Sequence, residues 1–330
     1  MTNRPYPIIL NPILMSKVWG GRGLSRLGKK LPHDGPFGES WELADLASTS
    51  SSGGGGGAAR SVIANGPLAG RTIHDALTMW GRGLLGEARP TPDGAIPLLI
   101  KFLDAKENLS VQVHPSPAYA AAHPGSDLKT ECWIILDAAP GSCIYKGVRS
   151  GVTPESFRRS IDHGTVAEHL VRVPAVVGEC HNLPSGTCHA LGAGVLVAEV
   201  QTPSDTTFRV FDWGRTGREL HVEQALECID FSEAPPATCL KPGQGRATLV
   251  QTEFFRVDRV RTESPIDAGR GMSAWIVIEG EGRVTGGDHP VAFDPVRVAR
   301  GDTFVIPSGC AVSSRLEPDR SFDVVRVEPA

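Results

Sequence analysis

Long apolar runs are absent from this sequence, and no stretch reaches the roughly 18–20 residues that a membrane helix needs. The opening residues, MTNRPYPIIL, also lack the pattern of a signal peptide. Charge of one sign is not in excess, because 33 Lys+Arg stand against 37 Asp+Glu and the formal net charge is -4. Without a basic field, nucleic acid is a poor partner. We therefore expect a protein that binds neither membranes nor nucleic acid.

Paired cysteine motifs are missing too. The chain of 330 residues has seven cysteines, an odd number, and none of them forms a C-x-x-C motif. A disulfide framework or a Cys-based zinc site is therefore not indicated. We expect reduced cysteines buried in the core, and hence a cytoplasmic protein.

Helical patterns are scarce, whereas turn formers are abundant, with 38 Gly and 26 Pro. Apolar spacing predicts helices at 71–80 and 153–171, the second with Thr153 as N-cap and Pro154 at its first position. Short β-rich runs fill much of the rest, at 97–103, 109–113, 132–136, 194–200, 254–260, 274–278 and 303–307. Such a density of short strands predicts a sandwich or a barrel.

One internal similarity organises the chain. Residues 178–189 (GECHNLPSGTCH) and 301–312 (GDTFVIPSGCAV) share a Gly-acid turn and a Pro-Ser-Gly turn at equal spacing. This pattern of turns is similar to the one that separates the later strands of a cupin jelly roll. The final position is His189 in the first copy and Val312, an expected core residue, in the second.

The expected fold is therefore mainly β, with two cupin-type jelly rolls and a few short helices inserted mostly in the N-terminal part. A Pro/Gly-rich stretch at 233–245 predicts the boundary, with a catalytic domain at 1–235 and a metal-free cupin-like domain at 236–330. The Ser/Gly-rich segment 48–59 is expected to be a flexible surface loop, because five consecutive glycines have no side chains to pack.

Four residues make a plausible metal site. Strand alternation in 109–114 places Ser110, Gln112 and His114 on one polar face, although a solvated face would give the same pattern. Glu131 opens an apolar strand, and Lys129 lies two residues before it as a compensating cation. Together, Gln112, His114, Glu131 and His189 suit a divalent transition metal; two imidazoles and a carboxylate favour zinc.

At this point the sequence resembles a known family. The ordered runs 97–116, 128–136, 183–194 and 199–215 look like the type I, zinc-dependent, cupin-fold mannose-6-phosphate isomerases, in their short bacterial form. The segments 10–21, 38–45 and 62–70 follow the same family pattern. The resemblance implies one Zn²⁺ per chain, held by Gln112, His114, Glu131 and His189. It further implies an active-site arginine at Arg209, functional residues at Lys129 and Glu199, and a pocket acid at Glu39.

The implied reaction interconverts mannose 6-phosphate and fructose 6-phosphate by moving a proton between C1 and C2 through an enediol. We expect Arg209 to support phosphate or enediolate charge. Either Glu199 or Lys129 would move the proton, and the sequence leaves that choice open. Ser110 is a candidate phosphate ligand or a simple polar filler. The expected partner is a small hexose phosphate, bound by a monomer or a weak homo-oligomer.

Two other functions are compatible with the same residues. A cupin oxygenase would use iron at two histidines and a carboxylate, and a sugar-phosphate-binding module would hold the metal without catalysis. Residues 23–30 (GLSRLGKK) imitate a phosphate-binding loop, but Lys30 stands where a Ser or Thr would be needed. That segment is therefore not expected to bind a nucleotide.

Overall fold

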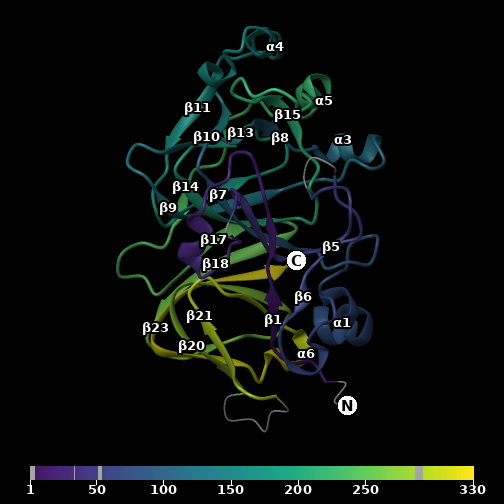
Figure 1. Cartoon of the computed structure of the whole chain (residues 1–330), viewed down its shortest axis with the longest axis vertical. Helices are drawn as coiled ribbons and strands as arrows, with labels where there is room; N and C mark the ends of the chain where they lie inside the picture. The colour runs from purple at the N-terminus through teal and green to yellow at the C-terminus, as the bar shows by residue number, and fades with distance from the viewer. Residues whose placement is uncertain (1–3, 33, 51–53, 287–292) are drawn as a thin grey trace.

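The computed structural model describes residues 4–32, 34–50, 54–286 and 293–330. It is built mainly from antiparallel strands with short helices at the periphery, which confirms the mainly β prediction (Figure 1). The α-helices are α1 (Ile73–Trp80), α2 (Arg82–Leu85), α3 (Pro117–Ala122), α4 (Pro154–Asp162), α5 (Val222–Cys228) and α6 (Ser308–Ala311). The 3₁₀ helices are η1 (Gly23–Leu27), η2 (Gly66–Leu68) and η3 (Val166–His169).

The first jelly roll is formed by two sheets that share a core. One has the strand order β16 (Thr238–Cys239), β12 (Glu179–Leu183), β9 (Glu131–Ala138), β14 (Val195–Gln201), β7 (Leu99–Ala105), β3 (Glu39–Leu43) and β2 (Ile13–Met15). The other has the order β11 (Leu170–Pro174), β10 (Cys143–Val148), β13 (His189–Leu191), β8 (Val111–Val113) and β15 (Phe208–Phe211). Side chains from both sheets, such as Trp133 and Leu191, pack together between them.

The second jelly roll is a nine-stranded sheet at the opposite end of the molecule from α4 and α5 (Figure 1). Its main path is β17 (Arg246–Gln251), β18 (Phe255–Thr262), β23 (Arg315–Pro329), β20 (Ser273–Thr285), β22 (Thr303–Ile306), β1 (Ile8–Asn11) and β6 (Val62–Ile63). Strands β19 (Ile266–Asp267) and β21 (Val296–Ala299) pair with β23 and β20, and β4 (Asp45–Leu46) pairs separately with β5 (Ala59–Arg60). The domain boundary near residue 235 stays a prediction. The N-terminal strand β1 pairs with β22 and so belongs to the sheet of the second jelly roll.

Strand β9 shows how the sequence pattern sets up the site. Its side chains alternate between two cores, with Cys132 and Ile134 in the large core that also receives residues of the second jelly roll. Trp133 and Ile135 point instead into the first jelly roll. Glu131, two residues before Trp133, therefore faces the interior of the first jelly roll, and Cys132 faces away from it.

Both predicted helices are present; α4 begins where expected, and α1 begins at Ile73, two residues after the predicted start at 71. Thr72 caps α1, and Thr153 caps α4 with Pro154 at the first position. The prediction of helix through residue 171 was wrong, because α4 ends at Asp162 and the chain continues through η3 into β11. Gly164 follows with φ +71, a left-handed conformation that stops a helix.

The second copy of the internal similarity differs from the first after its Pro-Ser-Gly turn. The first copy continues into strand β13 with His189 buried, whereas the second forms the short helix α6. Helical geometry turns Cys310 and Ala311 inward and leaves Val312 70% exposed. The prediction of a core residue at Val312 was therefore wrong.

The segment that imitates a phosphate-binding loop has a packing role. Lys29 is nearly buried and makes an ion pair of 2.6 Å with Glu42 of β3. Its ammonium group also donates a hydrogen bond to the Gly301 carbonyl oxygen, at 2.8 Å. Lys29 thereby links a strand of the first jelly roll to the second.

Two further observations bear on the sequence predictions. None of the helices within the described residues is long and apolar enough to cross a membrane. All seven cysteines lie in the described part of the chain as free thiols, and of these Cys239 alone is exposed.

Candidate metal centre and adjoining cleft

Three residues from three different strands meet inside the first jelly roll. His114 follows β8, Glu131 opens β9 and His189 opens β13, and each side chain is almost completely buried. One potential ligand atom from each lies within 4.8 Å of the others. The Nε2 atoms of His114 and His189 lie 3.5 and 3.2 Å from the two Glu131 carboxylate oxygens. These three residues could hold a metal ion.

Hydrogen bonds orient both imidazoles toward this centre. Nδ1 of His114 lies 2.9 Å from the Thr206 carbonyl oxygen, and Nδ1 of His189 lies 2.8 Å from that of Thr187. A carbonyl oxygen only accepts, so each Nδ1 carries the proton and each Nε2 presents its lone pair to the centre. This is the arrangement expected for histidine ligands of a metal.

The protonation states also suit a metal. Burial, reinforced by the Lys129 cation, lowers the pKa of His114 to about 3, so its ring is neutral near pH 7. Burial opposes ionisation of Glu131, but the nearby Lys129 ammonium lowers the pKa of Glu131 well below its usual value. Among the described residues, His114 Nε2 and Glu131 Oε1 are buried without a hydrogen-bond partner. Unsatisfied buried acceptors are costly, and a bound cation would satisfy them.

Gln112 stands directly beside the triad. It pairs with His189 in the register of β8 and β13, and its amide nitrogen lies 3.3 Å from His189 Nε2. The fourth residue of the predicted ligand set is thus next to the centre.

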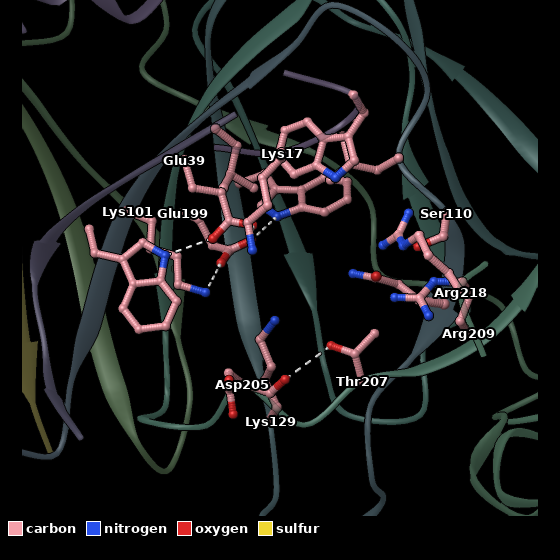
Figure 2. Close-up of a pocket in the computed structure, with 16 residues that line it drawn as sticks. Lys17, Glu39, Lys101, Ser110, Lys129, Glu199, Asp205, Thr207, Arg209 and Arg218 are labelled. Atoms are coloured by element: carbon pink, nitrogen blue, oxygen red, sulfur yellow. Dashed lines mark hydrogen bonds and ion pairs between the residues drawn. The ribbon is translucent and has the colours of Figure 1, made fainter. Parts of the chain in front are cut away.

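The centre adjoins a cleft whose lining is rich in charge (Figure 2). Its basic residues are Lys17, Lys101, Lys129, Arg209 and Arg218, and its acidic residues are Glu39, Glu199 and Asp205. Ser110 and Thr207 supply hydroxyl groups to the same wall. Five basic side chains against three acidic ones give the cleft lining a local excess of positive charge, although the net charge of the chain is -4.

Arg209 lies in β15, opposite Gln112 of β8. Its side chain is 3% exposed, and its Nη1 donates a hydrogen bond to the Glu219 carbonyl oxygen at 2.8 Å. Its Nε is buried with no partner among the described residues. A buried, partly unsatisfied guanidinium at the cleft wall retains donors for an anionic ligand.

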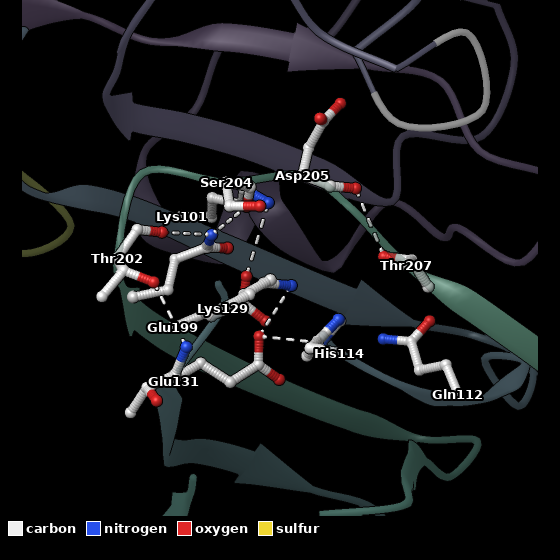
Figure 3. A network of polar contacts seen from close by, with 12 residues as sticks. Lys101, Gln112, His114, Lys129, Glu131, Glu199, Thr202, Ser204, Asp205 and Thr207 are labelled. Carbon is white, nitrogen blue, oxygen red and sulfur yellow. Dashed lines mark hydrogen bonds and ion pairs between the residues drawn. The ribbon is translucent and has the colours of Figure 1, made fainter. Parts of the chain in front are cut away.

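Glu199 and Lys129 both face the cleft but differ in their partners (Figure 3). Glu199 accepts a hydrogen bond from the Trp133 indole at 2.8 Å and lies 3.5 Å from the Lys101 ammonium. Lys129 makes an ion pair of 2.7 Å with Glu131. Burial and the Glu131 charge raise the pKa of Glu199. Although burial favours the neutral amine, Glu131 raises the pKa of Lys129 above its usual value.

The remaining predicted site residues lie in the same cleft. Glu39 accepts a hydrogen bond from the Trp41 indole at 2.6 Å and is 3.3 Å from the Lys17 ammonium. Ser110 is buried and lines the wall near Gln112. The structure therefore brings every sequence-predicted site residue to the centre or to its adjoining cleft.

Three cleft residues were missed by the sequence analysis: Lys17, Asp205 and Arg218. Arg218 is held by the buried carboxylate of Asp212, with both oxygens 3.1 Å from its Nη1. Nothing local distinguishes Arg218 from the nearby Arg215, which binds the same carboxylate.

Comparison with known proteins identifies the family to which this chain belongs. Residues 8–146 match the family model described as "Phosphomannose isomerase type I, catalytic domain". Mannose-6-phosphate isomerase ManA of Bacillus subtilis is 32% identical over 317 residues, 92% of this chain and 93% of that protein. Mannose-6-phosphate isomerase of Streptococcus mutans is 32% identical over 315 residues, 92% of each chain.

Solved structures give the same result. The crystal structure of mannose 6-phosphate isomerase from Bacillus subtilis matches with a TM-score of 0.82 and 29% identity, over 98% of this chain and 99% of that one. A mannose 6-phosphate isomerase bound with zinc and yttrium has the same fold, with a TM-score of 0.70 and 16% identity, over 98% of this chain and 99% of that one. The protein is thus a cupin-fold enzyme with a metal-binding site. More particularly, the chain belongs to the type I phosphomannose isomerase family.

Proposed function

We propose that this protein is a zinc-dependent isomerase that interconverts mannose 6-phosphate and fructose 6-phosphate. One observation carries the proposal: a buried set of two imidazoles and a carboxylate opens into a cleft with an excess of cations. The first element suits zinc, and the second suits a phosphorylated substrate.

His114, Glu131 and His189 would hold the zinc ion, with Gln112 as a fourth ligand once its amide rotates to present the oxygen. A bound zinc ion would supply positive charge beside the substrate oxygens and so stabilise enediolate charge. The protonated Lys129 sits next to Glu131 and adds a second positive charge to that region.

Substrate orientation is assigned to the cleft wall. Arg209 would bind the phosphate or the developing enediolate through its unsatisfied donors, and Ser110 offers a hydroxyl at the same wall. Glu39, fixed by Trp41 and Lys17, is in position to accept hydrogen bonds from sugar hydroxyls. Binding energy from these contacts would hold C1 and C2 in place for proton transfer.

Glu199 is assigned as the group that moves the proton. A raised pKa lies nearer to pH 7 than that of an ordinary glutamate. The Glu199 carboxyl therefore takes up and releases a proton more readily near that pH. Lys129 is the weaker choice because its ammonium is held by Glu131 and retains its proton.

A coupled assay and metal analysis test the proposal together. Purified protein is expected to contain about one zinc ion per chain. It should convert mannose 6-phosphate to fructose 6-phosphate, followed through conversion to glucose 6-phosphate, and lose this activity on chelation. Oxygen consumption without isomerisation would support an oxygenase. Tight binding of the sugar phosphate without turnover would support a binding module. The comparisons favour neither alternative, since the relatives are named as isomerases.

The remaining proposals concern partners and location. A small hexose phosphate is the proposed ligand, bound by a monomer or weak homo-oligomer that does not bind nucleic acid. We also propose a cytoplasmic location, supported by the seven free thiols. Sedimentation at several protein concentrations would report the oligomeric state.

A further inference from the structure

A carboxylate of the cleft wall is held by the Ser/Gly-rich segment, part of which lies outside the described residues at 51–53. Asp205 lies in the turn between β14 and β15 and lines the cleft. Its Oδ2 accepts hydrogen bonds from the Ser50 backbone N–H at 2.7 Å and the Gly54 N–H at 3.1 Å. The Ser50 hydroxyl donates to the same oxygen at 3.0 Å.

The described part of this segment folds onto itself. The N–H groups of Gly55 and Gly56 donate to the Ser50 carbonyl oxygen at 3.0 and 3.2 Å. The Thr49 hydroxyl donates to the Gly57 carbonyl oxygen at 2.8 Å. These bonds give the segment a defined shape around the donors that reach Asp205.

Two glycines of the segment differ sharply in what a side chain would meet. A Cβ on Gly54 would lie 2.5 Å from atoms of the Thr49 side chain, which is well inside van der Waals contact. A Cβ on Gly57 would meet nothing within 4 Å. Neither has the positive φ that disfavours alanine, so these glycines form a matched pair.

The charge of Asp205 gives these contacts a consequence. A free carboxylate turned into the cleft would repel a phosphorylated substrate, whereas one that accepts three hydrogen bonds is held and partly neutralised. Figure 3 shows the Asp205 carboxylate directed away from Glu131.

We propose that Ser50 and Gly54 are positioning residues for substrate binding, because they hold the Asp205 carboxylate out of the path of the phosphate. This inference rests on the proposed function for the identity of the substrate. Ser50 and Gly54 thereby set the affinity for the anion and leave the proton-transfer step unchanged.

The decisive experiment compares Gly54→Ala with Gly57→Ala in the zinc-loaded enzyme. Gly54→Ala should raise KM for mannose 6-phosphate about tenfold, while kcat stays within about twofold of the wild-type value. Gly57→Ala should leave both constants at the wild-type values. Equal behaviour of the two variants, or a fall in kcat at unchanged KM, overturns the proposal.

Ser50→Ala provides a second variant that removes one donor without adding bulk. It should raise KM by about threefold, since two of the three hydrogen bonds remain. An unchanged KM in Ser50→Ala would contradict the proposal even if Gly54→Ala failed to fold.

A binding measurement separates this inference from the proposed function. Isothermal titration with inorganic phosphate measures anion affinity without any turnover. If the wild-type protein fails to isomerise the sugar, the proposed function fails. A weaker phosphate affinity in Gly54→Ala than in Gly57→Ala would still support the inference, and equal affinities would refute it.

Discussion

The Trp133 indole donates a hydrogen bond to the Glu199 carboxylate across two neighbouring strands, at 2.8 Å. This contact fixes the carboxylate at the cleft wall while its second oxygen lies 3.5 Å from the Lys101 ammonium. A carboxyl group held this firmly, with a pKa raised by burial and by the Glu131 charge, is suited to exchanging a proton with a bound sugar.

The first prediction concerns Glu199. Glu199→Gln keeps an acceptor for the Trp133 indole but cannot take up a proton. Its kcat should fall by about 10²–10⁴-fold, the usual contribution of general acid–base catalysis. Zinc content, measured by mass spectrometry, should stay at the wild-type level because Glu199 is not one of the proposed ligands. Wild-type turnover in this variant would reassign the proton transfer, with Lys129 as the next group to test.

The second prediction concerns Arg209. Arg209→Ala should reduce turnover by orders of magnitude and leave the metal content unchanged, because it removes a buried guanidinium from the cleft wall. Arg209→Lys should recover part of the activity, since it retains the charge but not the planar fork. Full activity of the alanine variant would refute the assignment.

Metal removal gives the third prediction. Without a cation, Glu131 and His114 keep buried atoms that lack a hydrogen-bond partner, so the apoprotein should be less stable. Dialysis against a chelator should lower the thermal unfolding midpoint, and added Zn²⁺ should restore both the midpoint and the activity. The same treatment of His189→Ala is the control, since a protein with a broken ligand set should respond little. An unchanged midpoint in the wild type would argue against a metal at this centre.

The fourth prediction concerns pH and His181, a buried histidine of β12. Burial, reinforced by the nearby Lys146 cation, lowers the pKa of His181 to about 4 from the ordinary value of 6.5. Between these pH values the unfolded imidazole binds a proton and the folded one does not. Its contribution to stability is therefore complete above pH 6.5 and declines as the pH falls toward 4, by at most about 1.4 kcal/mol per pH unit.

The matching experiment uses urea unfolding of the zinc-loaded protein. The free energy of unfolding of the wild type should fall more between pH 7 and pH 5 than that of His181→Gln, which has no titrating ring. Other histidines contribute equally to both proteins and cancel in the difference. Identical pH dependence of the two would show that folding does not lower the pKa of His181.

The fifth prediction compares two adjacent lysines. Lys29 makes a buried ion pair with Glu42, whereas Lys30 is exposed. Lys29→Ala leaves the Glu42 charge buried and unpaired, and should lower the free energy of unfolding by about 3–5 kcal/mol. Lys30→Ala should change it by less than about 0.5 kcal/mol. If the two substitutions changed the free energy of unfolding by similar amounts, Lys29 would not be a stabilising link between the jelly rolls.

The local features of the site and of the start of α4 could be predicted from the sequence. Alternation in a strand put Gln112 and His114 on one face, and the two-residue step from Lys129 to Glu131 placed a cation beside the acid. The capping residue Thr153 marked the start of α4 because its side chain satisfies a helix N–H group locally. The end of α4 and the exposure of Val312 were mispredicted, since both depend on how the following segment packs.

The tertiary structure decided which distant residues share the cleft. Lys17 lies far in sequence from Asp205 and Arg218, all three have contexts that any surface residue could have, and only the pairing of strands brings them together. The same holds for the Ser/Gly-rich segment, whose composition indicates flexibility while its backbone N–H groups bind Asp205. Local sequence sets periodicity and capping, which act over a few residues. The burial and the local charge of a site residue depend on all the residues around it, and only the folded chain brings those residues together.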